Sequence, residues 1–345
     1  MIDFRYHLVS IVAVFLALTV GIVVGTTALN GGIVDTLRAS NTKVIRDKRN
    51  LETSVNQLRA QVSRRDEFAG ATARRVVAGR LAGERVIFVG APGASDDTIA
   101  ALEALVVAAG GRSTGLLRLQ NDLVDAAKAQ FVDDVVARVA PPGLELSADS
   151  PSERAAAELA TAVSARKGVS SDAGAKILGG FTGADLVSVA PTQGGRPSDL
   201  IGSATMAVIV TGAGDQPDDA AAQQRQKPLL ALARALDDRS GGVVVAGPAG
   251  AAAAGGVIAA IRGDSALSAR VSTVDTVEAA YARVAVILAL GEQAAGKTGR
   301  YGEGPGSQAA APSSAPSSAS SPAPSPASSP ASSPASSPVP SPAPS

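Results

Sequence analysis

An uncharged apolar run near the start of the chain constrains the fold more than any other feature. Residues 8–29 contain no charged side chain and consist mostly of Leu, Ile, Val, Phe and Ala. A helix needs about 20 apolar residues to cross a bilayer, at about 1.5 Å per residue. The run therefore predicts an N-terminal transmembrane anchor over residues 1–31. A cleaved signal peptide, whose apolar region is usually about 7–15 residues long, and a buried core helix are the alternatives.

A seven-residue repeat of apolar side chains follows the predicted anchor. Such an a/d repeat is typical of a coiled coil, and an Asn at an a position favours a dimer. It predicts a coiled-coil stalk over residues 32–68, with an amphipathic helix lying on the chain's own domain as the alternative. One row of the repeat is Leu37, Val44, Leu51 and Leu58, and the companion row is Val34, Asn41, Lys48, Val55 and Val62.

Two glycines in the anchor add to the indication of a dimer. Gly21 and Gly25 match the G-x-x-x-G pattern, which lets two spanning helices approach closely. Together with the heptads they predict a parallel homodimer in a lipid bilayer. The residues expected at the dimer contact are Gly21, Gly25, Leu37, Val44, Leu51, Val55, Leu58 and Val62.

Short β-branched stretches alternate with Ala-rich helical stretches over residues 80–300. This alternation predicts an α/β globular domain with a Rossmann-like, mostly parallel sheet covered by helices on both faces. The expected strands are 85–89, 115–119, 186–190, 206–211, 243–246 and 269–274. The expected helices are 95–109, 121–139, 152–167, 218–236, an Ala/Gly-rich helix ending at 262, and 276–295.

Glycine-rich turns follow three of the predicted strands. Ligands of such sheets bind beyond the carboxyl ends of the strands, where backbone N–H groups can bind an anion. Glycine is also common in tight strand-to-helix turns, and this structural interpretation is the favoured one. The candidate anion-binding residues are Gly90, Gly93, Gly212, Gly214, Gly247 and Gly250.

The sequence contains few residues of the types that catalysis, metal binding or cofactor binding would require. The chain has no Cys, a single His at residue 7 and two Met, which excludes a thiol nucleophile and, because the His precedes the predicted span, a Ser-His-Asp triad. Residues 291–298 match the phosphate-binding loop pattern but follow a predicted helix, so Gly296 is interpreted as a helix C-cap. We predict no enzyme activity, metal site or cofactor. First-turn positions in helices, rather than a cation site, explain the acidic residues Asp96, Asp97, Asp215, Asp218 and Asp219.

Charge and aromatic content argue against nucleic-acid binding. Lys plus Arg and Asp plus Glu both number 31, so the formal net charge is zero. Aromatic residues make up only 3% of the chain and Trp is absent. Neither a basic surface nor a platform for base stacking is therefore expected.

The last part of the chain, residues 301–345, consists almost entirely of Pro, Ser, Ala and Gly. It cannot bury a core and is predicted to be a disordered tail. Segments of this kind are typical of stalks outside the membrane. We therefore expect a single-pass cell-membrane protein whose α/β domain and tail lie on the extracytoplasmic side. A cell-wall or envelope component is then a candidate partner. The basic residues that follow the span favour the opposite orientation, although long domains cross membranes largely regardless of charge.

The sequence resembles the actinobacterial MctB family over residues 1 to about 304. The resemblance implies a copper transporter-type protein of the cell envelope, associated with copper homeostasis or transport, and brings no catalytic or metal motif with it. Copper prefers thiolate, thioether or clustered imidazole ligands, which this chain does not supply. An envelope scaffold without a copper role and a nucleotide- or anion-binding protein are the alternatives. The segments that carry the resemblance are 3–18, the heptad stalk, 86–90, 273–276, 286–293 and 301–302.

Overall fold

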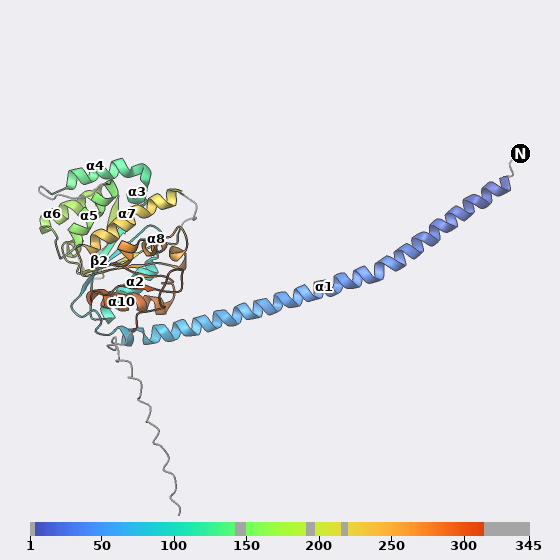
Figure 1. Cartoon of the computed structure of the whole chain (residues 1–345), viewed down its shortest axis with the longest axis horizontal. Coiled ribbons are helices and arrows are strands. Elements are labelled where there is room, and N and C mark those ends of the chain that lie inside the picture. The colour runs from blue at the N-terminus through green and yellow to red at the C-terminus, as the bar shows by residue number, and fades with distance from the viewer. Residues whose placement is uncertain (1–3, 142–149, 191–196, 215–219, 314–345) are drawn as a thin grey trace, which may run out of the picture. The chain divides into compact units, whose positions relative to one another are not determined.

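The predicted anchor and stalk form one continuous helix, α1 (Phe4–Val77) (Figure 1). The computed structural model describes residues 4–141, 150–190, 197–214 and 220–313. No proline lies within residues 4–77, so every residue of this helix keeps the N–H group that an intrahelical hydrogen bond needs. Within α1, the segment Tyr6–Thr26 is long and apolar enough to cross a membrane, with a mean hydropathy of 2.8. The pairing of two stalks in a coiled coil stays a prediction.

A seven-stranded, mostly parallel sheet forms the centre of the α/β domain, as the sequence predicts. The strand order is β3-β2-β1-β4-β5-β6-β7, and only the edge strand β3 runs antiparallel to its neighbour. The order reverses direction between β1 and β4, as in Rossmann-like sheets. The strands are β1 (Arg85–Gly90), β2 (Arg112–Leu119), β3 (Val187–Ala190), β4 (Met206–Val210), β5 (Val243–Ala246), β6 (Ser272–Val274) and β7 (Arg300–Tyr301).

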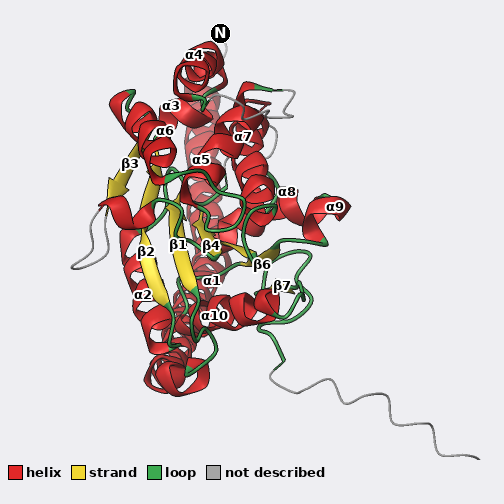
Figure 2. Cartoon of the chain, turned by 90° about the vertical axis from the view of Figure 1, so that its left-hand side faces the viewer, coloured by secondary structure: helices red, strands yellow, loops and turns green. Residues whose placement is uncertain are grey.

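Helices cover both faces of this sheet (Figures 1 and 2). One face carries α2 (Asp96–Ala108), α10 (Ala280–Ala294) and the carboxyl end of α1. The opposite face carries α3 (Asn121–Val124), α4 (Ala129–Val139), α5 (Pro151–Val163), α6 (Ser171–Gly183), α7 (Ala220–Asp237) and α8 (Val257–Gly263). Shorter elements are α9 (Ser265–Ser268) and the 3-10 helices Ala126–Lys128, Pro197–Leu200 and Ala249–Ala252.

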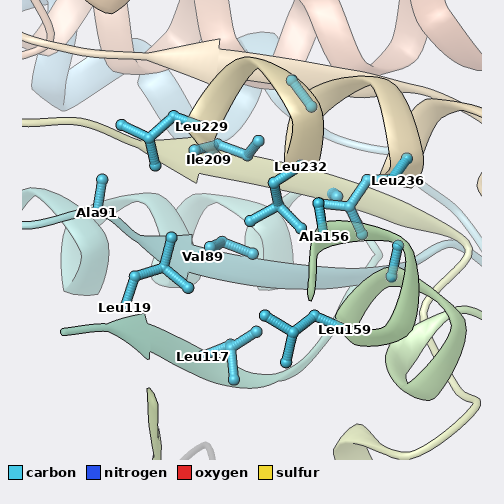
Figure 3. Packing of buried hydrophobic residues seen from close by; sticks show 14 of the residues in the cluster. Val89, Ala91, Leu117, Leu119, Ala156, Leu159, Ile209, Leu229, Leu232 and Leu236 are labelled. Atoms are coloured by element: carbon cyan, nitrogen blue, oxygen red, sulfur yellow. The ribbon is translucent and has the colours of Figure 1, made fainter. Parts of the chain in front are cut away.

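Alternating side chains of the central strands divide the core into two layers. Val86 and Phe88 of β1 pack with α2 and α10, whereas Ile87 and Val89 pack with the helices of the other face. The period of two residues along a strand sends neighbouring side chains to opposite faces. Figure 3 shows the second layer, in which Val89 and Ile209 of the sheet face Leu232 of α7.

The structure differs from the sequence predictions in several local elements. The helix expected over 121–139 is divided into α3, a 3-10 helix and α4, because the side chain of Asp125 accepts from the Ala127 N–H and caps the 3-10 helix Ala126–Lys128. Helix α6 was not predicted from its glycine-rich sequence. Residues 302–312, assigned to the tail, fold back along β7: Gly302 N–H donates to the Ala309 carbonyl at 2.9 Å, and Gln308 N–H to Arg300 at 2.7 Å. Residues 314–345 lie outside the described part of the chain.

Candidate functional site

The three predicted glycine loops lie together at the carboxyl edge of the sheet. They follow β1, β4 and β5, which are neighbours in the strand order. At this edge the N–H groups of Ala91, Thr211 and Gly247 donate to carbonyls of the adjacent strand, at 2.8, 2.8 and 3.0 Å. These three donors are therefore used by the fold itself.

The glycines of these loops allow backbone to approach backbone. A Cβ at Gly212 would lie 2.9 Å from the Pro92 carbonyl oxygen, and one at Gly214 would lie 2.8 Å from that of Gly250. A side chain at Gly247 would collide with Thr211. Gly93 has a φ of +78°, a conformation that favours glycine. Close packing between loops thus accounts for glycine at these positions, and anion binding there stays a prediction.

The match to a phosphate-binding loop at residues 291–298 has the wrong structural context. Gly291 lies inside α10, and Gly296, with a φ of +74°, follows the last helical turn. Lys297 N–H closes this helix end by donating to the Glu292 carbonyl at 2.9 Å. The interpretation of Gly296 as a helix end is confirmed.

A buried carboxylate, Asp275, lies at the carboxyl end of β6 and is the centre of the candidate site. Its side chain is fully buried. One oxygen, Oδ1, accepts hydrogen bonds from the Thr276 hydroxyl at 2.6 Å and from the N–H groups of Glu303 and Gly304 at 2.8 and 3.0 Å. Gly302, at φ +120°, lies so close to Asp275 that a Cβ there would collide with the carboxylate. The carboxylate thus holds the chain that folds back after β7.

The guanidinium of Arg262, in α8, neutralises this carboxylate. Its Nη2 lies 2.8 Å from Oδ2 of Asp275, and its side chain is only 4% exposed. The same guanidinium donates to Thr273 Oγ1 at 3.0 Å and to the carbonyls of Pro305 and Tyr301 at 2.8 and 2.7 Å. Arg262 therefore supplies the positive charge that a bound cation would otherwise supply.

The pKa of Asp275 results from two opposing effects. Burial alone would raise the pKa of this carboxyl, because a charge is poorly solvated in the protein interior. Hydrogen bonds from Thr276, Glu303, Gly304 and Arg262 outweigh that effect and lower the pKa below its ordinary value. Thr276 has a φ of +60°, unusual for a β-branched residue. The site therefore maintains a charged aspartate and a strained backbone in the same place.

The long helix α1 contacts the chain shortly after Asp275, at the start of α10. The side chain of Asp66 accepts a hydrogen bond from the N–H of Ala280, the first residue of α10. Ala73 and Val77 of α1 are buried beside α10. The carboxyl end of the long helix is thus attached at the start of α10, five residues after Asp275 in the sequence.

A second buried carboxyl group, Glu158 of α5, has a different environment. Its side chain is fully buried, and neither oxygen has a hydrogen-bond partner within the described part of the chain. Burial raises the pKa of Glu158 from 4.5 to about 7, although the charge of Lys176 acts in the opposite direction. The group takes up its proton near neutral pH.

Copper ligands do not converge in the part of the chain that the structure describes. Across residues 4–141, 150–190, 197–214 and 220–313, no group of three or more His, Cys, Asp or Glu side chains is placed to hold a metal ion. His7 lies at the start of the apolar segment of α1, and Met206 is buried in β4. Of the acidic residues near the glycine loops, Asp96 and Asp97 occupy the first turn of α2 behind the cap Ser95, and residues 215–219 lie outside the described ranges.

Sequence reasoning missed the Asp275 site because its members are far apart in the chain. Arg262, Asp275 and the carbonyl of Pro305 come from three separate segments. The available signal was that the stretches 273–276 and 301–302, which carry the family resemblance, contain Asp275 and Gly302. The structure brings these two stretches into contact.

Comparison with known proteins gives a consistent match along the chain. The family model described as "Copper transport outer membrane protein, MctB" matches residues 1–312. The protein named "Copper transporter MctB" from Mycobacterium tuberculosis is 31% identical over 329 residues, covering 91% of this chain and 100% of the relative. The protein of the same name from Mycobacterium leprae is 31% identical over 323 residues, covering 89% of this chain and 98% of the relative.

Proposed function

The chain belongs to the MctB family, and from this premise we propose that it is a membrane-anchored envelope protein linked to copper transport, with no catalytic activity of its own. The observation that carries the proposal is the extent of the match. It runs from the apolar segment of α1 to the end of the segment held by Asp275 and Arg262. Relatives named as copper transporters are covered over almost their whole length.

The copper link in this proposal does not require a copper site in the α/β domain. Soft ligands are what copper prefers, and the chain has no Cys. Two buried charges of the domain, Asp275 and Arg262, neutralise each other. We therefore assign the domain a role through protein contacts in the envelope.

We place the α/β domain and the tail on the extracytoplasmic side of the membrane, with two chains in parallel. The tail composition supports this orientation, because Pro/Ser-rich segments are typical of regions outside the membrane. Exposed Leu and Val side chains along α1 support the dimer. A cell-wall or envelope component is the partner we propose for the tail.

Growth of a deletion strain on a copper gradient tests the function. We expect reduced growth at high copper, restored by the full chain, and unchanged growth on a zinc gradient. Equal growth of deletion and parent strains at every copper concentration would reject the copper role. That result would favour the alternative, an envelope scaffold without a copper role. The absence of converging metal ligands among the described residues is consistent with this alternative.

Labelling of single cysteines tests the orientation, since the chain has none of its own. Thr53→Cys in the stalk and Ser345→Cys at the end of the tail should react with a membrane-impermeant maleimide in intact cells. Asp3→Cys, which precedes the apolar segment, should react only after the membrane is opened. The reverse pattern would reject the extracytoplasmic placement. A cysteine at Gly304 would be unsuitable as a tail label, because a Cβ there would lie 2.6 Å from the Cβ of Ala252 and 3.1 Å from Oδ2 of Asp275.

A further inference from the structure

An apolar stripe on α1 is exposed to solvent beyond the apolar span. Five branched aliphatic side chains in the two rows of the heptad repeat are each at least 60% exposed: Leu37, Val44, Leu51, Leu58 and Val62. At 3.6 residues per turn they fall within an arc of about 60° on the helix. A helix with such a row of apolar side chains needs a second surface to cover it.

The same stripe continues into the part of α1 that the chain itself covers. Asp66, Ala69, Ala73 and Val77 follow Val62 at spacings of four, three, four and four residues, which keeps them within about 60° of its direction. Ala73 and Val77 are 5% and 0% exposed beneath α10, and Asp66 accepts the hydrogen bond from Ala280. One stripe thus has two parts, an open part up to Val62 and a covered part from Asp66 onward.

We propose that the open part is covered by the same part of a second copy of this chain, and that the two stalks separate between Val62 and Asp66. Beyond that point each chain's own α10 occupies the surface that a partner helix would need. The inference refines the dimer of the proposed function by fixing where its helix-helix interface ends.

Charges within the stripe fit a parallel partner in register. Lys48 occupies an a position, and its Nζ lies 3.7 Å from Glu52 of the same helix. In a parallel pair the two Lys48 side chains meet at one level, where Asp47 and Glu52 of both chains flank them. Two positive and four negative groups then lie together, which offsets the repulsion between the two lysines. The anchors of both copies in one membrane impose the same parallel direction.

The small side chains of the covered part explain why a partner helix does not extend there. A Cβ added at Gly70 would lie 4.0 Å from the Cβ of Ala280, so α1 and α10 pack closely without a large side chain between them. The heptad also ends here, because the next d position is Arg65. Sequence and packing therefore place the end of the paired region at the same turn of α1.

Disulfide formation between single cysteines tests this division in membranes that contain the full chain. A disulfide needs Cβ atoms about 3.5–4.5 Å apart. Cysteines at 37, 44, 51, 58 and 62 should give covalent dimer at a yield at least several-fold above that of Arg46→Cys, Thr53→Cys and Ala60→Cys, on the opposite side of the helix. Ala69→Cys and Ala73→Cys, in the direction of the stripe, should give the low yield of the controls.

Three results would overturn the inference. A high yield that continues through Ala69 and Ala73 would show that α10 does not end the paired region. Equal yields on both sides of the helix, or covalent dimer at no position, would show that no second copy covers the stripe. Copper-dependent growth is a separate readout, so the copper role can fail while the pairing holds, and the reverse.

Discussion

Two buried carboxyl groups of the α/β domain have very different surroundings. Asp275 lies at the edge of the sheet, and Glu158 lies within the helical layer. Both side chains are fully buried. Asp275 has an ion pair with Arg262 and three hydrogen-bond donors, and the pKa of its carboxyl is lowered. Glu158 has no hydrogen-bond partner among the described residues, and burial raises its pKa to about 7.

The difference shows that burial alone does not determine the charge of a carboxyl group. Removing a carboxylate from water is costly, and only nearby donors or an opposite charge offset the cost. At Asp275 two of the three donors are backbone N–H groups of the segment that folds back after β7, so the charge and the segment stabilise each other. At Glu158 the neighbours on α5 are Ala155, Ala156 and Leu159, which are buried and apolar.

The largest effect is expected from Asp275→Ala, which leaves Arg262 charged and buried without its partner. Breaking one side of a buried ion pair typically costs about 3–5 kcal/mol. We expect a loss of this size in the free energy of unfolding at pH 7, measured by denaturant titration of the full chain in detergent. Proteolysis within residues 302–312 should also become faster, because their N–H contacts with Asp275 are lost.

The pH dependence and a double variant provide the controls for Asp275. Since the folded-state pKa of Asp275 is lowered, its stabilising contribution is present above the unfolded pKa and is lost as the pH falls through the folded pKa. The difference between wild type and Asp275→Ala should therefore shrink on acidification. Removing both charges, in Arg262→Met with Asp275→Leu, should cost less than Asp275→Ala alone. Arg262→Met and Asp275→Leu are also measured singly. If the cost of the double variant equals the sum of these two single costs, the pair is not coupled.

Glu158→Gln should have the opposite sign, because it removes a carboxyl that is buried without donors. The folded-state pKa of about 7 lies above the ordinary 4.5, so wild-type stability falls as the pH rises from about 4.5 to 7 and stays low above that. We expect the variant to be more stable than wild type at pH 8 by about 1–3 kcal/mol, and nearly equal at pH 4.5. Unfolding measured at both pH values checks this.

Glu153→Gln is the matched control for that experiment. Glu153 lies on the same helix and forms the capping box with Ser150, where its side chain accepts from the Ser150 N–H. This substitution keeps an acceptor oxygen at a helix start and leaves the carboxyl at Glu158 unchanged. If both variants change the pH slope equally, the slope does not originate at Glu158.

The extent to which the sequence predicts these features depends on how local their causes are. The apolar segment of α1, the strands Arg85–Gly90 and Val243–Ala246, and the cap Ser95 each follow from neighbouring residues, and the structure has them. The Asp275 site depends on segments that meet only after the sheet forms. The burial of Glu158 depends on the helices around α5, so the polar residue gave no local sign of an interior position.

Asp66→Ala should have a smaller effect, because this carboxylate is only partly buried and has one backbone donor at the start of α10. Loss of a capping side chain typically costs about 1 kcal/mol. We expect a decrease of that size, measured by the same denaturant titration, and faster amide exchange at Ala280. Asp66→Asn keeps the acceptor oxygen and should remain within a few tenths of a kcal/mol of wild type. An equal loss in both variants would indicate that the charge, rather than the hydrogen bond, matters.

The smallest effect is expected at Lys176, whose charge lowers the pKa of Glu158 while burial raises it. Lys176 is exposed, and its charge lowers the pKa of Glu158 against the larger effect of burial. Lys176→Met should therefore raise that pKa further, as measured by carbon NMR of the Glu158 carboxyl across a pH titration. Because the lysine is in contact with water, the energy involved should be below about 1 kcal/mol.

Salt and a charge-conserving variant make this small shift interpretable. Added salt screens the attraction, so it should raise the pKa of Glu158 in wild type and leave it nearly unchanged in Lys176→Met. Lys176→Arg keeps the positive charge and should titrate as wild type does. If the pKa of Glu158 falls in Lys176→Met, the lysine side chain raises this pKa by excluding water more than its charge lowers it. In that case solvent access, and not partner charge, would be what separates Glu158 from Asp275.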